Sequence, residues 1–451
     1  MKFVTHVLSG LVPVEVPFEV VPSSTFEVVG CSPAHSRETR VRVRAALLSH
    51  GVPEGALCAR VVLPDGARAV SDLHVALALL ALAGVVPEES LHRTLVVGDL
   101  TLTGAVAATR GTLPLLDGVQ DVRRAIVPYA GREEASRTSS GADVYAVQTL
   151  AGAVDVLRSG VKRFLVAKQP LDPLETREDM SDLGDLGGVA RALEVAVAGG
   201  HGLLLVGPPG AGKTSVARRV RSLLPAHDEA TLREVAHLRS VAAIESREVP
   251  FRAPHHTMSS AGLVGGGEPY RPGEVSLAHG GVLFLDEQPE FRLAVLQSLR
   301  DPLRSGEAVV VRERVRRAFP ARVQLVAAAG PCYCGFRGVS SRACSCSPES
   351  VARYAARLSE CPIAPSLSVK VRVPCVDPRA QTSRSGESSE VVRARVTQAR
   401  RRQVERQGKL NAQLMTDEME AVAQTIADLA GTVQVDPVHC EEARALTAWP
   451  V

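Results

Sequence analysis

The chain has 451 residues, 45% of them hydrophobic and 22% charged, and a formal net charge of +3. That length exceeds what one hydrophobic core usually supports, so two or three domains are expected. The small net charge does not by itself indicate a nucleic-acid-binding protein, and an aromatic content of 3% argues against base-stacking platforms.

The sequence contains no run of 18 or more apolar residues and does not begin like a signal peptide. We therefore expect a cytoplasmic protein that makes no membrane contact. The nine cysteines are expected to be reduced, because disulfide frameworks belong to secreted chains.

Residues 1–165 alternate short Val-rich strands with helical segments, which predicts an α+β domain. Helical spacing of apolar residues occurs over 40–51 and 71–84, and 93–106 is typical of a strand, a turn and a second strand. The polar segment 166–188 contains Pro and Gly and is predicted to be an inter-domain linker.

The segment LLLVGPPGAGKTSVARRV, 203–220, joins an apolar strand, a glycine-rich loop and a helix. Gly207 to Thr214 fits G-x-x-x-x-G-K-[ST] at every defined position. Loop amides and the helix N-terminus attract phosphate, Lys213 would contact the β- and γ-phosphates, and Thr214 would bind Mg²⁺. ATP and Mg²⁺ are therefore the expected cofactors. The predicted nucleotide-binding residues are Gly207, Pro208, Pro209, Gly210, Ala211, Gly212, Lys213, Thr214 and Ser215.

A second carboxylate site follows in GGVLFLDEQPEF, 280–291, where four apolar residues form a buried strand that ends in two acids. Asp286 would hold Mg²⁺ through water, and Glu287 would orient the attacking water. The predicted catalytic residues are thus Glu287, Asp286 and Lys213, within an α/β domain spanning 189–378.

A third strand, within 321–332, ends at Ala329 and Gly330. In ATPases of this build that strand ends in a polar residue that contacts the γ-phosphate and the water. Gly330 has no side chain able to do so.

Four cysteines cluster in the next segment as two close pairs, and four thiolates can complete a tetrahedral Zn²⁺ site. One residue separates the cysteines of each pair, where two are usual, and four reduced cysteines without metal are the alternative. The predicted zinc ligands are Cys332, Cys334, Cys344 and Cys346. The scattered cysteines are expected to be packing residues; they are Cys31, Cys58, Cys361, Cys375 and Cys440.

Two further groups have open roles. His255 and His256 are expected on a strand, where neighbours point to opposite faces, so a shared metal is not expected and a structural role is one candidate. Arg252 and Arg271 flank a glycine-rich segment suited to a flexible loop.

Residues 379–451 are predicted to form a C-terminal helical region. It contains the Ser-rich break 381–390, in which Ser388 or Ser389 is the candidate N-cap of a helix. Its basic run either binds phosphate or is a solvated helix face. The run consists of Arg393, Arg395, Arg400, Arg401, Arg402 and Arg406.

The segment FRAPHHTMSSAGLVGGGEPYRPGEVSLAHGGVLFLDEQPEF, 251–291, closely resembles the ComM/YifB family of magnesium-chelatase-like AAA+ ATPases, linked to competence and DNA recombination. Segments 386–403, 408–414 and 425–431 resemble the same family. Residues 36–47 and 96–106 resemble its N-terminal Lon-protease-like (S5-type) domain. The resemblance implies a ring, expected to be a homo-hexamer, that uses ATP to move branched or single-stranded DNA, and a zinc cluster shared by the family. In such a ring, the segment flanked by Arg252 and Arg271 is suited to face the channel, and a pore-loop role is the other candidate for His255 and His256.

Peptidase activity of the Lon-like half would need a Ser nucleophile beside a Lys base. Ser71 lies near the expected nucleophile position, but the region expected to supply the base, ATRGTLPLLDGV, contains no Lys. We therefore predict a domain without a catalytic dyad, serving in assembly or DNA contact.

The chain departs from the family pattern in three places. Gly330 replaces the family's Asn, no Arg lies between Arg357 and Arg372 to act as an arginine finger, and only residues 415–424 replace a long segment that carries a sensor Arg. An arginine finger is worth about 10³- to 10⁵-fold in rate. Two functions stay open: an active DNA motor, and an ATP-binding ring subunit deficient in hydrolysis. A magnesium-chelatase-type subunit is a third, which the Lon-like half argues against.

Overall fold

A computed structural model describes residues 1–67, 70–159, 162–183, 188–312, 315–339, 342–375, 386–408, 413 and 417–449. The chain divides into two compact units: Met1–Leu171 with Ala236–Glu245, and Asp172–Val235 with Ser246–Val451. Each unit has its own sheets and buried core, so the predicted multidomain α/β class is confirmed. The finer division at residues 165, 188 and 378 stays a prediction.

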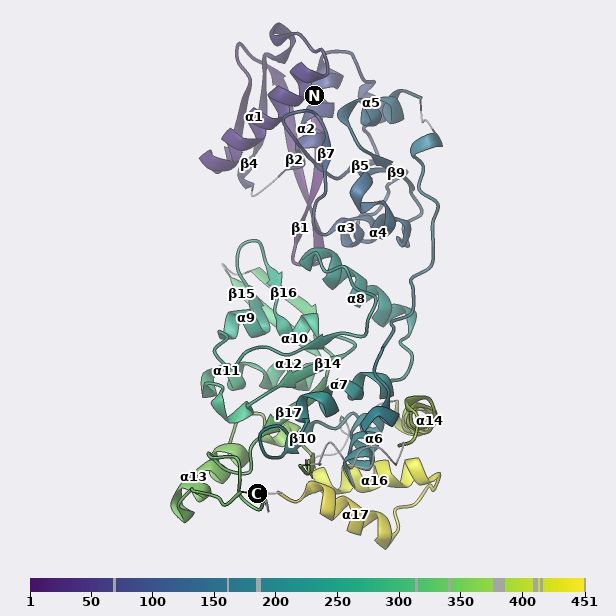
Figure 1. Ribbon diagram of the computed structural model, residues 1–451. Helices are drawn as coiled ribbons and strands as arrows, with labels where there is room; N and C mark the ends of the chain where they lie inside the picture. The colour runs from purple at the N-terminus through teal and green to yellow at the C-terminus, as the bar shows by residue number, and fades with distance from the viewer. Residues whose placement is uncertain are drawn as a thin grey trace. The chain divides into compact units, whose positions relative to one another are not determined.

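The first unit begins with a four-stranded mixed sheet ordered β1-β2-β4-β3. β1 and β2 form a long antiparallel hairpin (Figure 1), and the side chains of Phe3, Phe18 and Val20 on it are buried. They share one core with two helices, because alternate strand residues face the same side. The elements are β1 (Lys2–Ser9), β2 (Val12–Pro22), β3 (Glu27–Cys31), β4 (Ala59–Ala67), α1 (Pro33–Ser49) and α2 (Asp72–Leu82).

Ser71 is the N-cap of α2. Its hydroxyl donates to the carbonyl of Gly98 at 2.7 Å and accepts from the amide of His74 at 3.3 Å. The hydroxyl therefore both donates and accepts a hydrogen bond at the start of a buried helix. Accepting from a first-turn amide is the usual role of a capping serine.

A parallel three-stranded sheet, ordered β5-β8-β9, completes the first unit. The predicted strand–turn–strand of 93–106 corresponds to β5 followed by a small β6–β7 ladder. The elements are β5 (Thr94–Val96), β6 (Asp99–Leu100), β7 (Val106–Ala107), β8 (Arg124–Pro128), β9 (Asp143–Val147), α3 (Thr112–Gly118), α4 (Arg132–Ser136) and α5 (Leu150–Ser159).

The second unit is built on a five-stranded parallel sheet ordered β11-β14-β17-β10-β18. Both faces of its central strands are buried in separate cores, which explains continuous apolar runs such as LLLV and VLFL. The strands are β10 (Leu203–Val206), β11 (Phe251–Arg252), β14 (Val282–Leu285), β17 (Gln324–Ala329) and β18 (Val369–Arg372).

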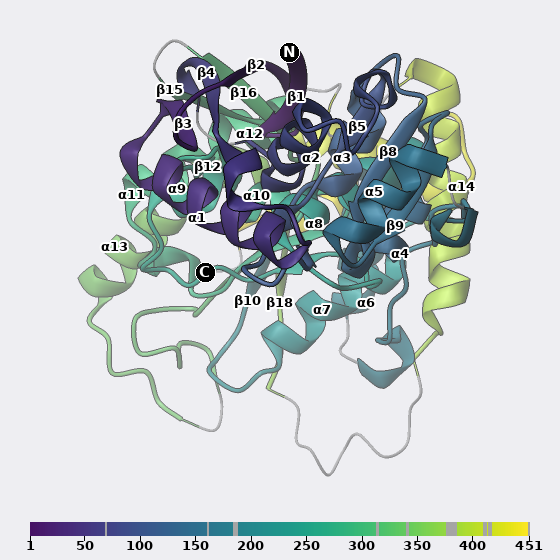
Figure 2. The same cartoon turned by 90° about the horizontal axis from the view of Figure 1, so that it is seen from above.

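Helices cover both faces of this sheet. α6, α14 and α16 pack together in one core, while α13 lies on the opposite side in both views (Figures 1 and 2). The helices are α6 (Val189–Gly199), α7 (Lys213–Leu223), α9 (Ser260–Val264), α10 (Glu274–Leu277), α11 (Leu293–Ser298), α12 (Arg300–Ser305), α13 (Pro348–Ser359), α14 (Ser389–Gln407), α16 (Glu418–Ala430) and α17 (Pro437–Thr447). α8 (Glu229–Ala242) runs across the division at Val235 and Ala236.

Two short hairpins project from the second unit's chain between the sheet strands: β12 (Gly265–Gly266) with β13 (Arg271–Pro272), and β15 (Glu307–Arg312) with β16 (Val315–Pro320). Ser388 is the N-cap residue of α14, as predicted. Parts of the Ser-rich break (381–385) and of GKLNAQL and the segment after it (409–412 and 414–416) lie outside the described residues. Among the helices in the described ranges, none combines the length and the apolar character needed to cross a bilayer.

Candidate nucleotide and metal sites

The glycine-rich loop connects the carboxyl end of β10 to the first turn of α7. Gly210 and Gly212 have φ values of 78° and 81°, a left-handed conformation that favours glycine. At Gly207, a Cβ atom would lie 2.6 Å from the carbonyl oxygen of Val373, the residue after β18, so the close approach of this segment also requires a glycine. The loop therefore has the curvature that exposes main-chain amides to phosphate.

Lys213 occupies the first position of α7 and turns back into this loop. Its ammonium donates to the carbonyls of Gly207 and Pro208 at 2.8 and 2.9 Å. Burial lowers the pKa of Lys213, an effect that the carboxylates of Asp286 and Glu287 oppose. The positive charge is thus held within the curve of the loop.

Asp286 lies beside Thr214 at the carboxyl edge of the sheet. The Thr214 hydroxyl donates to Asp286 Oδ2 at 3.1 Å, and the main-chain amide of Glu287 donates to Asp286 Oδ1 at 3.0 Å. A hydroxyl and a carboxylate are the ligand types that Mg²⁺ takes in such sites, so this donor set fits the metal.

Glu287 has a left-handed backbone conformation, with φ 50° and ψ 45°. Non-glycine residues adopt it rarely, and such residues concentrate at functional sites. Its carboxylate is 69% exposed and lies 3.7 Å from Nδ1 of His256.

The histidine pair differs from its prediction. His255 and His256 lie beyond β11 in a turn, not on a strand, and their rings are 4.1 Å apart at 33°. The expected opposite orientation is therefore wrong, since a turn does not alternate side chains as a strand does. His255 contacts Thr257 at 2.8 Å, while His256 faces Glu287.

The glycine-rich segment flanked by Arg252 and Arg271 contains the short β12–β13 hairpin. Its flexibility and its place in a channel stay predictions. Arg271 is exposed on β13. Arg252 is held by two contacts with the carboxylate of Glu274, at 2.5 and 2.7 Å.

At the end of β17, the main-chain amide of Gly330 donates to the hydroxyl of Tyr354 on α13 at 3.1 Å. Tyr354 is 5% exposed, and burial raises the pKa of its phenol to about 12. The phenol therefore stays protonated at neutral pH. Sequence reasoning missed Tyr354, because no local motif marks a residue that reaches this strand end from α13.

The four cysteines converge. The Sγ atoms of Cys332, Cys334 and Cys344 lie 3.4 to 3.6 Å apart, and the amide of Cys334 donates to Cys346 Sγ at 3.4 Å. All four sulfurs lie within 4.8 Å of one another. Four Zn–S bonds of about 2.3 Å place tetrahedral sulfurs about 3.8 Å apart, so the set fits Zn²⁺.

The four thiols share their charge unevenly. The amides of Phe336 and Ser345 lower the pKa of the Cys334 thiol to about 5. Burial and the neighbouring sulfurs of Cys332 and Cys334 raise the pKa of Cys346 and raise that of Cys344 to about 12. Cys334 is therefore the thiol that these surroundings favour as a thiolate, the form that binds metal.

Four of the six arginines in the basic run on α14 contact other residues of the second unit. Arg395 contacts Glu194 and Glu387, and Arg400 donates twice to the carbonyl of Val197, at 3.0 and 2.7 Å. Arg402 donates to the carbonyl of Asp428, and Arg406 pairs with its carboxylate. These contacts pack α14 against α6 and α16; Arg401 is exposed.

The β15–β16 hairpin carries basic residues that sequence reasoning did not single out. Arg312 and Arg316 are exposed, and Val311 is 67% exposed beside them. The valine-rich run in EAVVVRERVRRAFP is the signal that could have indicated a strand here, because β-branched residues are enriched in strands.

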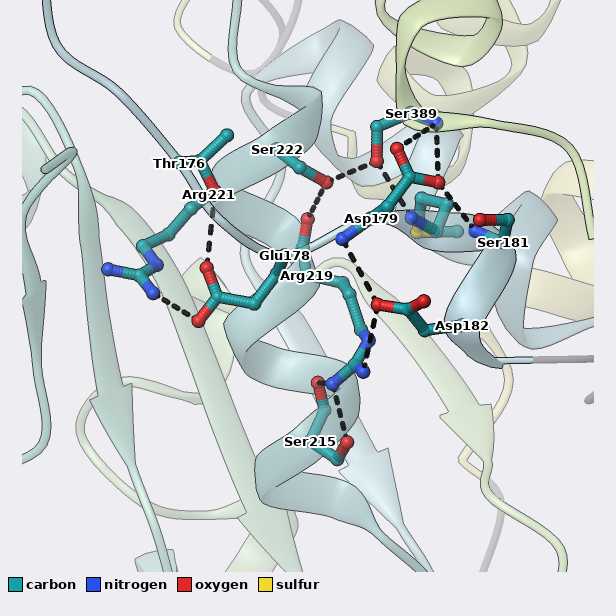
Figure 3. Close-up of polar contacts among 11 residues, drawn as sticks. Thr176, Glu178, Asp179, Ser181, Asp182, Ser215, Arg219, Arg221, Ser222 and Ser389 are labelled. Atoms are coloured by element: carbon teal, nitrogen blue, oxygen red, sulfur yellow. Dashed lines mark hydrogen bonds and ion pairs between the residues drawn. The ribbon is translucent and has the colours of Figure 1, made fainter.

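The helix that follows the glycine-rich loop is anchored by a polar network (Figure 3). Arg219 donates to the Ser215 hydroxyl at 2.6 Å, and the Ser222 hydroxyl contacts that of Ser389 at 2.6 Å. Arg221, 6% exposed, pairs with Glu178 and with Glu248. α7 is thereby fixed to the segment before α6 and to the start of α14.

Comparisons with known proteins agree with this geometry. The family model described as magnesium chelatase, subunit ChlI, matches residues 179–381. The chain is 36% identical to the uncharacterised protein YifB of Escherichia coli, over 94% of this chain and 85% of that protein. It is 34% identical to the competence protein ComM of Haemophilus influenzae, over 93% of this chain and 91% of that protein. It is 38% identical to an uncharacterised protein of Mycobacterium bovis, over 83% of this chain and 76% of that protein.

Proposed function

The chain belongs to the ComM/YifB family of magnesium-chelatase-like AAA+ proteins, and from that premise we propose that it binds ATP with Mg²⁺ and acts on branched or single-stranded DNA. The observation that carries the nucleotide site is the Thr214–Asp286 hydrogen bond beside a loop that holds Lys213. It brings the two halves of a P-loop site together across the sheet.

In this proposal Lys213 contacts the β- and γ-phosphates. Thr214 and Asp286 hold Mg²⁺, which neutralises phosphate charge when bound. Glu287 orients water for attack on the γ-phosphate. The loop amides from Gly207 to Ser215 bind the remaining phosphate oxygens.

DNA is the proposed partner because a near full-length relative is named a competence protein. The exposed arginines of the β15–β16 hairpin support this assignment, since arginine contacts phosphate well. We further propose a homo-hexameric ring in the cytoplasm, Zn²⁺ bound by the four cysteines, and a Lon-like first unit that serves assembly or DNA contact rather than peptide hydrolysis.

A second candidate, an ATP-binding ring subunit deficient in hydrolysis, is favoured by one observation. The end of β17 offers no side chain at Gly330, and removing one positioned polar group near a transition state costs about 10²- to 10³-fold in rate. A chelatase-type subunit has less support, because the chelatase model matches only residues 179–381.

Steady-state ATP turnover with and without forked DNA tests these candidates, with nucleotide affinity measured in parallel. Glu287→Gln is the control for hydrolysis and Lys213→Ala the control for binding. Turnover of about 0.1 s⁻¹ or more that Glu287→Gln abolishes would support the motor, because it lies within about tenfold of the 1 s⁻¹ at which enzymes typically begin.

Tight ATP binding without turnover above Glu287→Gln would support the hydrolysis-deficient subunit. Nucleotide affinity that is equal in Lys213→Ala and the unaltered protein would contradict the P-loop assignment itself.

A further inference from the structure

We propose that metal binding by the four-cysteine loop, residues 331–339 and 342–346, braces the P-loop and thereby sets nucleotide affinity. The inference rests on the proposed ATP and Zn²⁺ sites and adds a physical connection between them. Two links carry it: a contact of this loop with the P-loop, and a hydrogen bond between the P-loop and β17, the strand that precedes the cysteine loop.

The first contact joins Gly335 of the cysteine loop to Pro209 of the P-loop. A Cβ atom on Gly335 would lie 2.7 Å from Pro209 Cδ and 3.0 Å from its Cγ. Real Cβ atoms do not approach that closely, so the main chain of one loop lies directly against the proline ring of the other. Gly335 also has φ 79°, which a larger residue adopts only with strain.

The cysteines fix the position of Gly335. Its amide donates to the carbonyl of Cys332 at 2.9 Å, and the neighbouring Cys334 donates its amide to Cys346 Sγ at 3.4 Å. Gly335 therefore lies within the turn that the cysteine cluster closes. A shared metal would hold this turn, because it links the first pair of cysteines to a second pair from the other end of the loop.

The second link is a hydrogen bond between the P-loop and β17. The amide of Gly207, the first P-loop residue, donates to the carbonyl of Ala329 at 3.1 Å, and Cys332 follows three residues later, 2% exposed. The P-loop and the cysteine loop thus leave adjacent strands at the same edge. Releasing the cysteine loop would remove support from Pro209. Part of the free energy of nucleotide binding would then be used to order the P-loop, and affinity would fall.

The test uses the full chain purified with its zinc, and a non-hydrolysable fluorescent ATP analogue with Mg²⁺. Zinc per chain and the dissociation constant are measured together. Cys344→Ser/Cys346→Ser should lose zinc and weaken binding at least about tenfold, the scale of ordering a loop on binding. Zinc removal from the unaltered protein by a zinc-selective chelator should do the same, and zinc readdition should restore affinity.

Gly335→Ala tests the contact between Gly335 and Pro209 while all four cysteines are kept. It should keep its zinc and still bind the analogue more weakly, because the added methyl displaces Pro209. Cys58→Ser, an exposed cysteine in the other unit, should change neither quantity.

Equal affinity with and without zinc, or Gly335→Ala binding as tightly as the unaltered protein, would overturn the brace while leaving the ATP site standing. A chain that does not bind zinc would also overturn it. If the zinc-loaded, unaltered protein binds no nucleotide at all, the proposed function fails, and the brace with it.

Discussion

The hydroxyl of Thr214 and the carboxylate of Asp286, 72 residues apart in the chain, are joined by a hydrogen bond of 3.1 Å. The sheet order explains the contact. β10 and β14 both pair with β17 in parallel, so the segments that follow them leave the same edge of the sheet. A hydroxyl and a carboxylate so placed are the protein ligands that a Mg²⁺–nucleotide complex needs.

Thr214→Val should therefore raise the Mg²⁺ concentration required for half-maximal ATP binding about tenfold or more, since bonds to charged groups are worth about 1.5–3 kcal/mol. A magnesium titration at fixed nucleotide measures this. Thr397→Val is the matched control, because the Thr397 hydroxyl donates to the carbonyl of Arg393 within α14. An unchanged magnesium requirement in Thr214→Val would contradict the assigned role.

Arg221→Ala should lower the free energy of unfolding by about 3–5 kcal/mol, the cost of removing one member of a buried ion pair. Arg221 is 6% exposed and pairs with Glu178 and Glu248, while its guanidinium lies 5.5 Å from the ring centre of Phe251. Urea unfolding measures the change. Arg304→Ala removes an 84% exposed arginine and should change stability by no more than about 0.5 kcal/mol. Equal effects of the two substitutions would refute the buried network's contribution.

His74 should make the first unit less stable as pH falls. Burial among Phe3 and Phe18 lowers the pKa of His74 to about 3, with a smaller effect from His6. The unfolded chain, with a pKa of about 6.5, binds a proton below that pH while the folded chain does not. Stability from this group is therefore complete above about pH 6.5 and declines by up to about 1.4 kcal/mol per pH unit on acidification towards the folded pKa.

His74→Phe keeps a ring in the cluster and removes the titration. Between about pH 6.5 and pH 5 it should lose about 2 kcal/mol less stability than the unaltered protein. Urea unfolding at several pH values measures the difference, and the exposed His92→Gln serves as control. Parallel pH profiles for His74→Phe and the unaltered protein would rule out the buried histidine as the cause.

Arg316→Ala should weaken DNA binding and reduce the slope of log K against log salt by about 0.7–0.9, the value of one phosphate contact. Nucleotide affinity should not change. Arg401→Ala is the matched control, since Arg401 is exposed on α14, the other basic element of the second unit. If the slope of log K against log salt fell in Arg401→Ala but not in Arg316→Ala, the DNA contact would be assigned to α14 instead of the hairpin.

The sequence by itself determined the P-loop and the acidic strand end, because these motifs are local. GPPGAGKT contains the glycines that adopt left-handed backbone, the lysine and the first residues of the helix within eight positions. Their relative geometry therefore follows from the local chain alone. The apolar run before Asp286 and Glu287 likewise predicted a buried strand, since a strand covered on both faces has no polar positions.

Only the tertiary structure decided which distant residues meet. The arginines of the α14 basic run differ in their surroundings: some contact Val197 and Asp428, while Arg401 is exposed. A count of charges carries no information about which residues lie opposite each face of a helix. The Tyr354 hydroxyl at Gly330 and the Pro209 ring at Gly335 depend on the packing of α13 and the cysteine loop at one sheet edge. Such contacts are set by strand order, and strand order follows from burying the whole core at once rather than from any local stretch of sequence.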